Sequence, residues 1–237
     1  MAVNYNPKIA TSGLVLYLDA ANTKSYPGSG LTWTDLSGNS NTGSLANGPV
    51  YSGTNNGFFT LDGTNDHILA NNTSLNSKFS STSVSHFTGV YPTGAGMIVS
   101  ELGQTTINTG WHDSNIEISS GGAFSFSTWH GGGGLGNKVV SSSQSFNNWY
   151  YVGFTYNGTT LTAYINGSSI GTTNFTRLAP YNNGQQTHYA LFAIDSTNMG
   201  TGGYGIGRVA SFSVYNRSLS ADEVAQNYNA LRGRFGI

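Results

Sequence analysis

Apolar residues alternate with polar ones in short runs along most of the chain. Leu14, Leu16 and Leu18 form one such run near the start of the sequence. A period of two residues is typical of a β-strand with one buried face. The pattern predicts about a dozen strands between residues 13 and 216, at the spacing expected of a β-sandwich.

The clearest predicted strands lie between residues 149 and 172. Two alternating runs occur there, consisting of Val152, Phe154 and Tyr156, and of Leu161, Ala163 and Ile165. An Asn-Gly pair follows each run, at 157–158 and at 166–167. Asn-Gly favours the type I′ turn of a hairpin, because both central residues of that turn need a positive φ. We therefore predict a three-stranded meander with two such turns.

The last predicted strand has one residue that does not fit its pattern. Ile206, Ala210, Phe212 and Val214 are expected to face the core, and Arg208 is the one charged member of the same alternating set.

One helix is predicted, over residues 220–232. Ser220 and Glu223 fit a capping box, in which each side chain bonds to the backbone N–H of the other residue. Leu219 and Val224 have the spacing of a hydrophobic staple, and Val224 begins an apolar stripe with Tyr228 and Leu231. Gly233 is then expected at the C′ position of the helix.

These elements predict an all-β fold, an antiparallel sandwich of the jelly-roll type with one short C-terminal helix. Residues 13–237 form the expected sandwich domain, including the helix. Residues 1–12 are polar, contain Pro7 and do not alternate, and they are predicted to form an N-terminal arm that contacts another protein.

Composition and charge exclude several classes of function. Only 8% of the 237 residues are charged, the formal net charge is −1, and the basic residues are scattered, which argues against nucleic-acid binding. Cysteine is absent, so thiolate chemistry and disulfides are excluded. No signal peptide or run of 18 apolar residues is visible, so we expect a protein made in a cytoplasm without membrane insertion.

Several blocks of sequence resemble one family of sandwich domains. The blocks are residues 13–20 (GLVLYLDA), 33–39 (WTDLSGN), 59–68 (FTLDGTNDHI), 148–158 (NWYYVGFTYNG) and 214–220 (VYNRSLS). Their order and spacing resemble laminin G-like, concanavalin A-like domains. The resemblance implies the fold more strongly than the function, because this sandwich occurs in lectins, in glycanases and in structural modules.

A narrower resemblance involves both ends of the sandwich domain. The segments 18–22 (LDAAN), 25–30 (SYPGSG) and 227–237 (NYNALRGRFGI) look like those of virion structural proteins of tailed bacteriophages. Such proteins are made in the host cytoplasm and form fibres, tips or capsid decorations. The resemblance implies a virion location and virion protein partners, contacted through the arm or a sheet edge.

No metal or cofactor is expected. Many relatives have acidic residues in the last strand that help to hold calcium, but this chain has Ala210 and Ser211 there. Asp19, Asp62 and Asp66 are the remaining oxygen ligands, and turn formation is the alternative explanation for them.

The acidic residues also argue against glycoside hydrolysis. That reaction needs two carboxyl groups about 5 to 9.5 Å apart. Asp113 and Glu117 are the best pair on one predicted strand, but four extended residues separate them by about 13 Å. A pair formed across two strands is left open by the sequence.

Four residues are candidates for glycan binding. Sugar sites combine an aromatic face with polar groups at the rim. Trp33 and Trp149 lie in the family-like blocks and are expected in the core. The candidates, Trp111, His112, Trp129 and His130, lie outside those blocks and next to glycines. The alternative is that each tryptophan covers an edge of the sandwich.

Together these observations predict a non-enzymatic bacteriophage virion surface protein, either a capsid decoration or a fibre-type protein. Host or environmental glycans, including cell-surface glycans, are its expected ligands. The alternatives are a polysaccharide-degrading glycoside hydrolase and a purely structural capsid cement.

Overall fold

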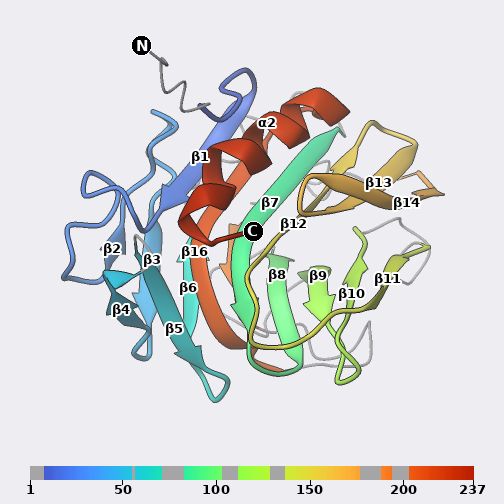
Figure 1. Cartoon of the computed structure of the whole chain (residues 1–237). Coiled ribbons are helices and arrows are strands. Elements are labelled where there is room, and N and C mark those ends of the chain that lie inside the picture. The colour runs from blue at the N-terminus through green and yellow to red at the C-terminus, as the bar shows by residue number, and fades with distance from the viewer. Residues whose placement is uncertain are drawn as a thin grey trace, which may run out of the picture.

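The computed structural model describes residues 8–54, 57–70, 83–102, 112–128, 137–176, 188–193 and 203–237. These residues form two antiparallel β-sheets that pack face to face, with one α-helix on the outside (Figure 1). The predicted all-β sandwich with a C-terminal helix is confirmed. No helix in the described ranges is long and apolar enough to cross a membrane.

Sheet A forms the layer that contacts the helix. Its strands are β1 (Leu14–Asp19), β4 (Val50–Ser52), β5 (Phe58–Asp62), β7 (Val84–Pro92), β12 (Tyr150–Tyr156), β13 (Thr160–Ile165), β14 (Ser168–Asn174) and β16 (Ile206–Tyr215). The strand order is β14–β13–β12–β7–β16–β5–β4, and β1 also pairs with β16.

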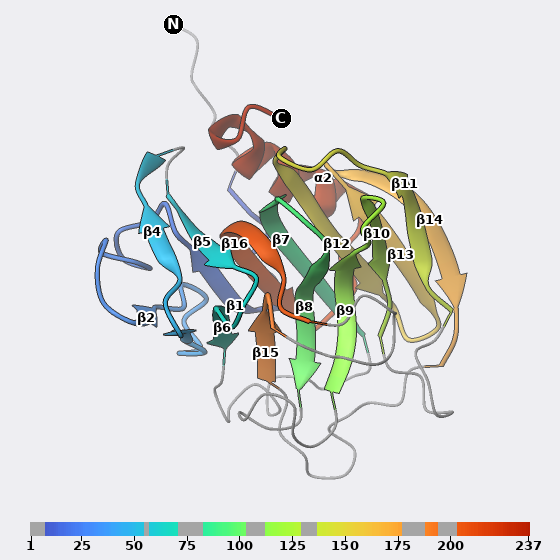
Figure 2. The same ribbon diagram turned by 90° about the horizontal axis from the view of Figure 1, so that it is seen from below.

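Sheet B forms the opposite layer (Figure 2). Its strands are β2 (Thr32–Trp33), β3 (Gly43–Ala46), β6 (His67–Ala70), β8 (Gly96–Leu102), β9 (His112–Ile118), β10 (Ala123–Phe126), β11 (Val139–Ser143) and β15 (His188–Leu191). The order is β11–β10–β9–β8–β15–β6–β3–β2. The described residues thus contain sixteen strands, more than the predicted dozen, because strands as short as β2 are too brief to show alternation.

The core between the sheets is aromatic. Trp33, Phe59, Phe154 and Phe212 are fully buried in it, and the expected core position of Trp33 is confirmed. A polar contact also crosses this layer: His86 Nε2 of β7 lies 3.0 Å from the Tyr189 hydroxyl of β15. Such a hydrogen bond joins the two sheets directly and fixes their relative position.

Both predicted hairpins form, but only one has the predicted turn. Asn166 has φ 50° and Gly167 has φ 77°, as the type I′ turn requires. The first connection instead comprises residues 157–159, and Gly158 has φ 106°. The Asn157 side chain accepts the Thr160 backbone N–H at 2.9 Å. This Asx-type capping stabilises a three-residue loop, so the predicted type I′ turn is wrong there.

The predicted inward face of the last strand is partly wrong. Phe212 and Val214 lie in the core, as expected, but Ala210 packs on the outer face and Ile206 is 37% exposed. The register of β16 shifts directly after Val209, which is the residue that enters the core there. A bulge adds one residue to a strand and therefore reverses the faces on its two sides.

The helix begins as predicted and ends differently. It is α2 (Ala221–Leu231), and the Ser220 hydroxyl accepts the Glu223 backbone N–H while the Glu223 carboxylate accepts that of Ser220. The predicted C′ position of Gly233 is wrong, because the chain continues into a 3₁₀-helix, η3 (Arg232–Arg234). The positive φ, 71°, occurs later, at Gly236.

Helix α2 packs on the upper part of the outer face of sheet A in the view of Figure 1. Its apolar stripe brings Val224 and Leu231 against Phe87 and Tyr215 of the sheet. Leu14 also faces this cluster, since a bulge in β1 turns it away from the core that Leu16 and Leu18 enter.

Residues 8–12 of the predicted arm lie on the protein's own helix. The Ala10 backbone N–H donates to Asn227 Oδ1 at 2.7 Å, and the Tyr215 hydroxyl donates to the Ala10 carbonyl at 3.0 Å. Gln226 donates to the Lys8 carbonyl at 2.6 Å. Residues 1–7 are outside the described residues.

Candidate functional site

Most of the predicted glycan-binding residues lie outside the described part of the chain. Trp111, Trp129 and His130 are not described, and of His112 only the backbone is, as the first residue of β9. The structure does, however, describe the strand ends to which these residues are joined.

The segments with the two tryptophans leave the same end of sheet B. His188 and His112 are the register partners of Leu102, so β15, β8 and β9 share this end (Figure 2). On the other side of β9, the Ser127 backbone N–H donates to the Asn115 carbonyl at 3.1 Å and extends the pairing with β10 towards Thr128. The backbone thus brings together the strand end that follows Trp111 and the strand end that precedes Trp129.

Polar groups at this end are buried, and several have no hydrogen-bond partner among the described residues. Ser127 and Thr128 are fully buried and His188 is 1% exposed. The hydroxyls of Ser127 and Thr128 and the Nδ1 atom of His188 find no partner within the part of the chain that the structure describes. Burial lowers the pKa of His188, which favours the neutral imidazole.

One pair of acidic residues is opposed across two strands at the same end. Asp113 of β9 is the register partner of Glu101 of β8. Register partners lie opposite each other on neighbouring strands, whereas Asp113 and Glu117 are four residues apart on one strand. The Glu101 side chain is fully buried. This is the cross-strand arrangement that the sequence left open for a hydrolase.

The three aspartates considered as calcium ligands have other contacts. Asp62 Oδ1 accepts the Thr64 backbone N–H at 2.8 Å, and this bond lowers the pKa of Asp62. Asp66 Oδ2 accepts the Asp62 backbone N–H at 3.2 Å, which is the turn geometry considered as the alternative. Asp19 forms an ion pair with Arg234. Within the described ranges, no group of three or more His, Cys, Asp or Glu residues is placed to hold a metal ion.

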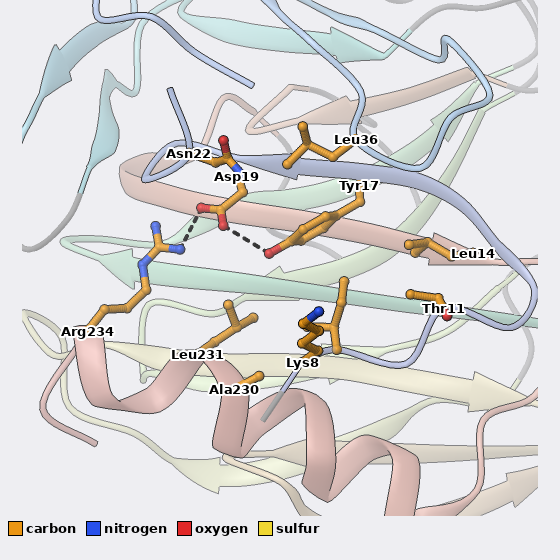
Figure 3. A pocket seen from close by; sticks show the side chains of 11 residues that line it. Lys8, Thr11, Leu14, Tyr17, Asp19, Asn22, Leu36, Ala230, Leu231 and Arg234 are labelled. Atoms are coloured by element: carbon orange, nitrogen blue, oxygen red, sulfur yellow. Dashed lines mark hydrogen bonds and ion pairs between the residues drawn. The ribbon is translucent and has the colours of Figure 1, made fainter. Parts of the chain in front are cut away.

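A pocket of about 530 Å³ lies between β1, the segment at residues 8–11 and the end of α2 (Figure 3). Leu14 and Leu231 contribute apolar walls, and Lys8 and Asn22 are polar residues of the lining. Asp19 and Arg234 line it as well, joined by their ion pair.

Three polar residues of this pocket, Tyr17, Asp19 and Arg234, bind one another. Arg234 Nη1 donates to Asp19 Oδ1 at 2.5 Å, and Arg234 Nη2 donates to the Gly57 carbonyl at 3.2 Å. The Tyr17 hydroxyl donates to Asp19 Oδ2 at 2.9 Å. Burial, and then the Asp19 carboxylate, raise the pKa of Tyr17 far above its usual range. The cluster therefore fastens β1 to the C-terminal segment.

A second group of residues, which the sequence did not predict, crosses the outer face of sheet A. The outer row consists of Val50, Thr60, Arg208 and Tyr91, which are register partners in turn across β4, β5, β16 and β7. Trp149 continues the row, since its ring centroid is 5.5 Å from that of Tyr91. Trp149 is buried, as expected, but beneath Phe235 on the outer face of the sheet.

Arg208 in this row is held by aromatic rings alone. Its Cζ atom lies 4.9 Å from the Phe58 ring centroid and 4.6 Å from that of Tyr91. Its guanidinium has no hydrogen bond or ion pair within the described part of the protein, and its side chain is half-buried. The signal for this site was the charged residue in an otherwise apolar alternation, which the bulge in β16 places on the outer face.

The chain matches a known family over most of the sandwich. The Laminin_G_3 model, described as the concanavalin A-like lectin/glucanases superfamily, matches residues 62–225. A search of curated proteins found no match.

Solved structures with the same fold include binding domains and enzymes. The binding domain of botulinum neurotoxin DC in complex with SialylT aligns with TM-score 0.66 and 16% identity, over 93% of this chain and 52% of that chain. Trypanosoma rangeli sialidase in complex with sialic acid aligns with TM-score 0.63 and 14% identity, over 93% of this chain and 33% of that chain. The chain therefore spans about half or a third of the length of these proteins, and the likeness concerns the fold.

Proposed function

Because the chain belongs to the concanavalin A-like lectin/glucanases superfamily, we propose that it is a non-enzymatic binding module that recognises glycans at one end of sheet B. The main support is the strand register, which joins the Trp111–His112 and Trp129–His130 segments to the same end of β9 and β10.

The proposed setting is the surface of a bacteriophage virion, as a capsid decoration or a fibre-type protein. The resemblance of both ends of the domain to tailed-phage virion proteins supports this setting. Fold neighbours support the glycan ligand: cell entry of botulinum neurotoxin type C depends on interaction with two ganglioside molecules, and its structure aligns with TM-score 0.68 and 17% identity.

Glycan binding is tested with Trp129→Ala and Trp111→Ala. The wild-type protein should bind a subset of glycans on an array of host-type and sialylated sugars, and each variant should bind at least tenfold more weakly with an unchanged melting temperature. Leu31→Ala is the matched control, since Leu31 is 71% exposed and belongs to neither segment. An array without binding, or two variants with wild-type affinity, would reject this site. Unfolded variants would mean that the rings are structural.

The virion setting is tested by two deletions. Removal of residues 1–7 should release the protein from particles and leave the sandwich folded. Removal of residues 1–12 should also break the bonds of Ala10 and Lys8 to α2, and so destabilise the domain. If the variant that lacks residues 1–7 stayed on the particles like the wild type, anchoring through these residues would be contradicted. A cement role would instead appear as particles that break more easily on heating when the protein is missing.

A glycoside hydrolase is the second candidate, and the Glu101–Asp113 pairing favours it. A retaining glycosidase has its carboxyl groups about 5 to 5.5 Å apart. The complete burial of Glu101 is the argument for placing it second, because a substrate must reach both groups.

Reducing-sugar release from laminarin, agarose and host polysaccharide is the measurement. We expect none above background. Turnover that is lost in both Glu101→Gln and Asp113→Asn, and kept in Asp222→Asn on the exposed helix surface, would reverse the order of the two candidates.

A further inference from the structure

The outer row presents a cation whose hydrogen-bonding capacity is unused. A guanidinium has five N–H donors in a planar fork that matches a carboxylate. The rings of Phe58 and Tyr91 hold the Arg208 guanidinium, and no group in the described residues accepts a hydrogen bond from it. Stacking fixes the plane of the fork, so little conformational entropy remains to be lost when an anion binds.

The neighbours of Arg208 indicate the kind of molecule that carries the anion. Thr60 and Tyr91 are the register partners of Arg208 on either side of it in the row, and each carries one hydroxyl. Val50, at the end of the row, is 65% exposed and adds an apolar contact. Strands are about 4.8 Å apart, so the row is roughly 14 Å long. A line of a cation, hydroxyls and a small apolar surface suits a polyhydroxylated chain with carboxylates better than an apolar peptide side chain.

The surroundings leave this part of sheet A available. Helix α2 covers the other half of the outer face, around Tyr215, and the C-terminal residues Phe235 and Ile237 pack at the border of the row (Figure 1). Thr60 is exposed, and Tyr91 and Arg208 are half-buried. The nearest contrast is Arg234, whose guanidinium already binds Asp19 and the Gly57 carbonyl.

We propose that the outer row is a binding site for carboxylate-bearing saccharides, with the Arg208 guanidinium donating two N–H groups to the carboxylate oxygens in a bidentate ion pair. The Thr60 and Tyr91 hydroxyls bind ring hydroxyls of the sugar on either side. This site is on sheet A, whereas the site proposed above is at one end of sheet B. The two can therefore fail independently.

The test uses the full chain and polygalacturonate, a saccharide whose only charged groups are carboxylates. The wild-type protein should bind it, and binding should weaken as salt increases. Arg208→Gln should weaken binding at least tenfold, and Arg208→Lys should weaken it less, because lysine keeps the charge and loses the fork. Arg232→Gln is the matched control: Arg232 also lies over a ring, at 5.7 Å from Tyr228, but is outside the row.

The outcomes separate the two proposed sites. Loss in Arg208→Gln with wild-type behaviour of Arg232→Gln and Trp129→Ala supports the outer row. Three results would overturn it: no binding of polygalacturonate by the wild type, an equal loss of binding in Arg208→Gln and Arg232→Gln, or a loss of binding in Trp129→Ala alone. Equally tight binding of poly-glutamate would overturn the assignment to sugars. Neutral-glycan binding that survives in Arg208→Gln would leave the sheet B site intact whatever the result here. The melting temperatures of Arg208→Gln and Arg232→Gln show whether each variant keeps the fold.

Discussion

Two arginines on the same side of sheet A have opposite environments. The Arg234 side chain is 9% exposed and forms an ion pair with Asp19, while Arg208 is half-buried between two rings and has no acceptor in the described residues. Both lie close to an aromatic ring, since Arg234 is 4.9 Å from the Phe235 centroid. The difference in acceptors indicates that Arg234 holds the fold together and that Arg208 is available to a ligand.

The largest expected effect comes from Arg234→Ala. It leaves the Asp19 carboxylate without its cation in a mostly buried position, and so should lower the free energy of unfolding by about 3 kcal/mol. Urea denaturation measures the change. Arg232→Ala, an exposed neighbour, should stay within about 0.5 kcal/mol of wild type. Equal losses in the two variants would contradict the structural role of the ion pair.

The next effect concerns the contacts of residues 8–10 with α2. Asn227→Ala removes the acceptor of the Ala10 N–H and the donor to the Tyr215 hydroxyl, so about 2 kcal/mol of stability should be lost. Limited proteolysis should then cut the N-terminal segment earlier. Asn229→Ala, at an exposed position of the same helix, is the control. A segment that stays protected in Asn227→Ala would mean that other contacts hold it.

A smaller effect should appear on acidification. The hydrogen bond from Arg217 lowers the pKa of Glu223 from its ordinary 4.5 to about 2. A carboxyl with a lowered pKa in the folded state stabilises the fold above pH 4.5, and this contribution is lost as the pH falls towards 2. The loss should be at most about 1 kcal/mol, since the pair is partly exposed. The free energy of unfolding measured from pH 5 to pH 2 should fall less in Glu223→Gln than in Asp222→Asn. The same pH dependence in both variants would refute the contribution assigned to Glu223.

The smallest effect on stability is expected for Arg208→Gln. Only the ring contacts are lost, which should cost less than about 1 kcal/mol. The same urea titration as for Arg234→Ala gives the comparison. A loss as large as that of Arg234→Ala would mean that Arg208 is a structural residue, and the contrast between the two arginines would disappear.

The local rules of the sequence predicted much of this fold. The capping box at Ser220 and Glu223 and the turn at Asn166-Gly167 depend on neighbouring residues, and both form. The type of the loop at residues 157–159 was not predictable in the same way, because the Asn157 side chain caps the loop there. The end of α2 was also missed, since Gly233 continues into a 3₁₀ turn.

The outer row was hidden for a different reason. Its members come from four strands, and pairing between strands distant in sequence is not contained in any local pattern. The bulge after Val209 then exchanged the faces of β16, so Arg208 looked like an anomaly in the core. For the sheet B site, the sequence identified candidate residues, and their placement stays a prediction. The opposition of Glu101 and Asp113 needed the register of β8 and β9.

The bonds between the Lys8–Ala10 segment and α2 also define a route for mechanical load. Ala10 is tied to Asn227 and Tyr215, so tension applied before residue 8 and after residue 231 meets at one small junction on sheet A. The strands of sheet B lie off this line of force. Load applied between these two points would therefore reach the hydrogen bonds between Ala10, Asn227 and Tyr215.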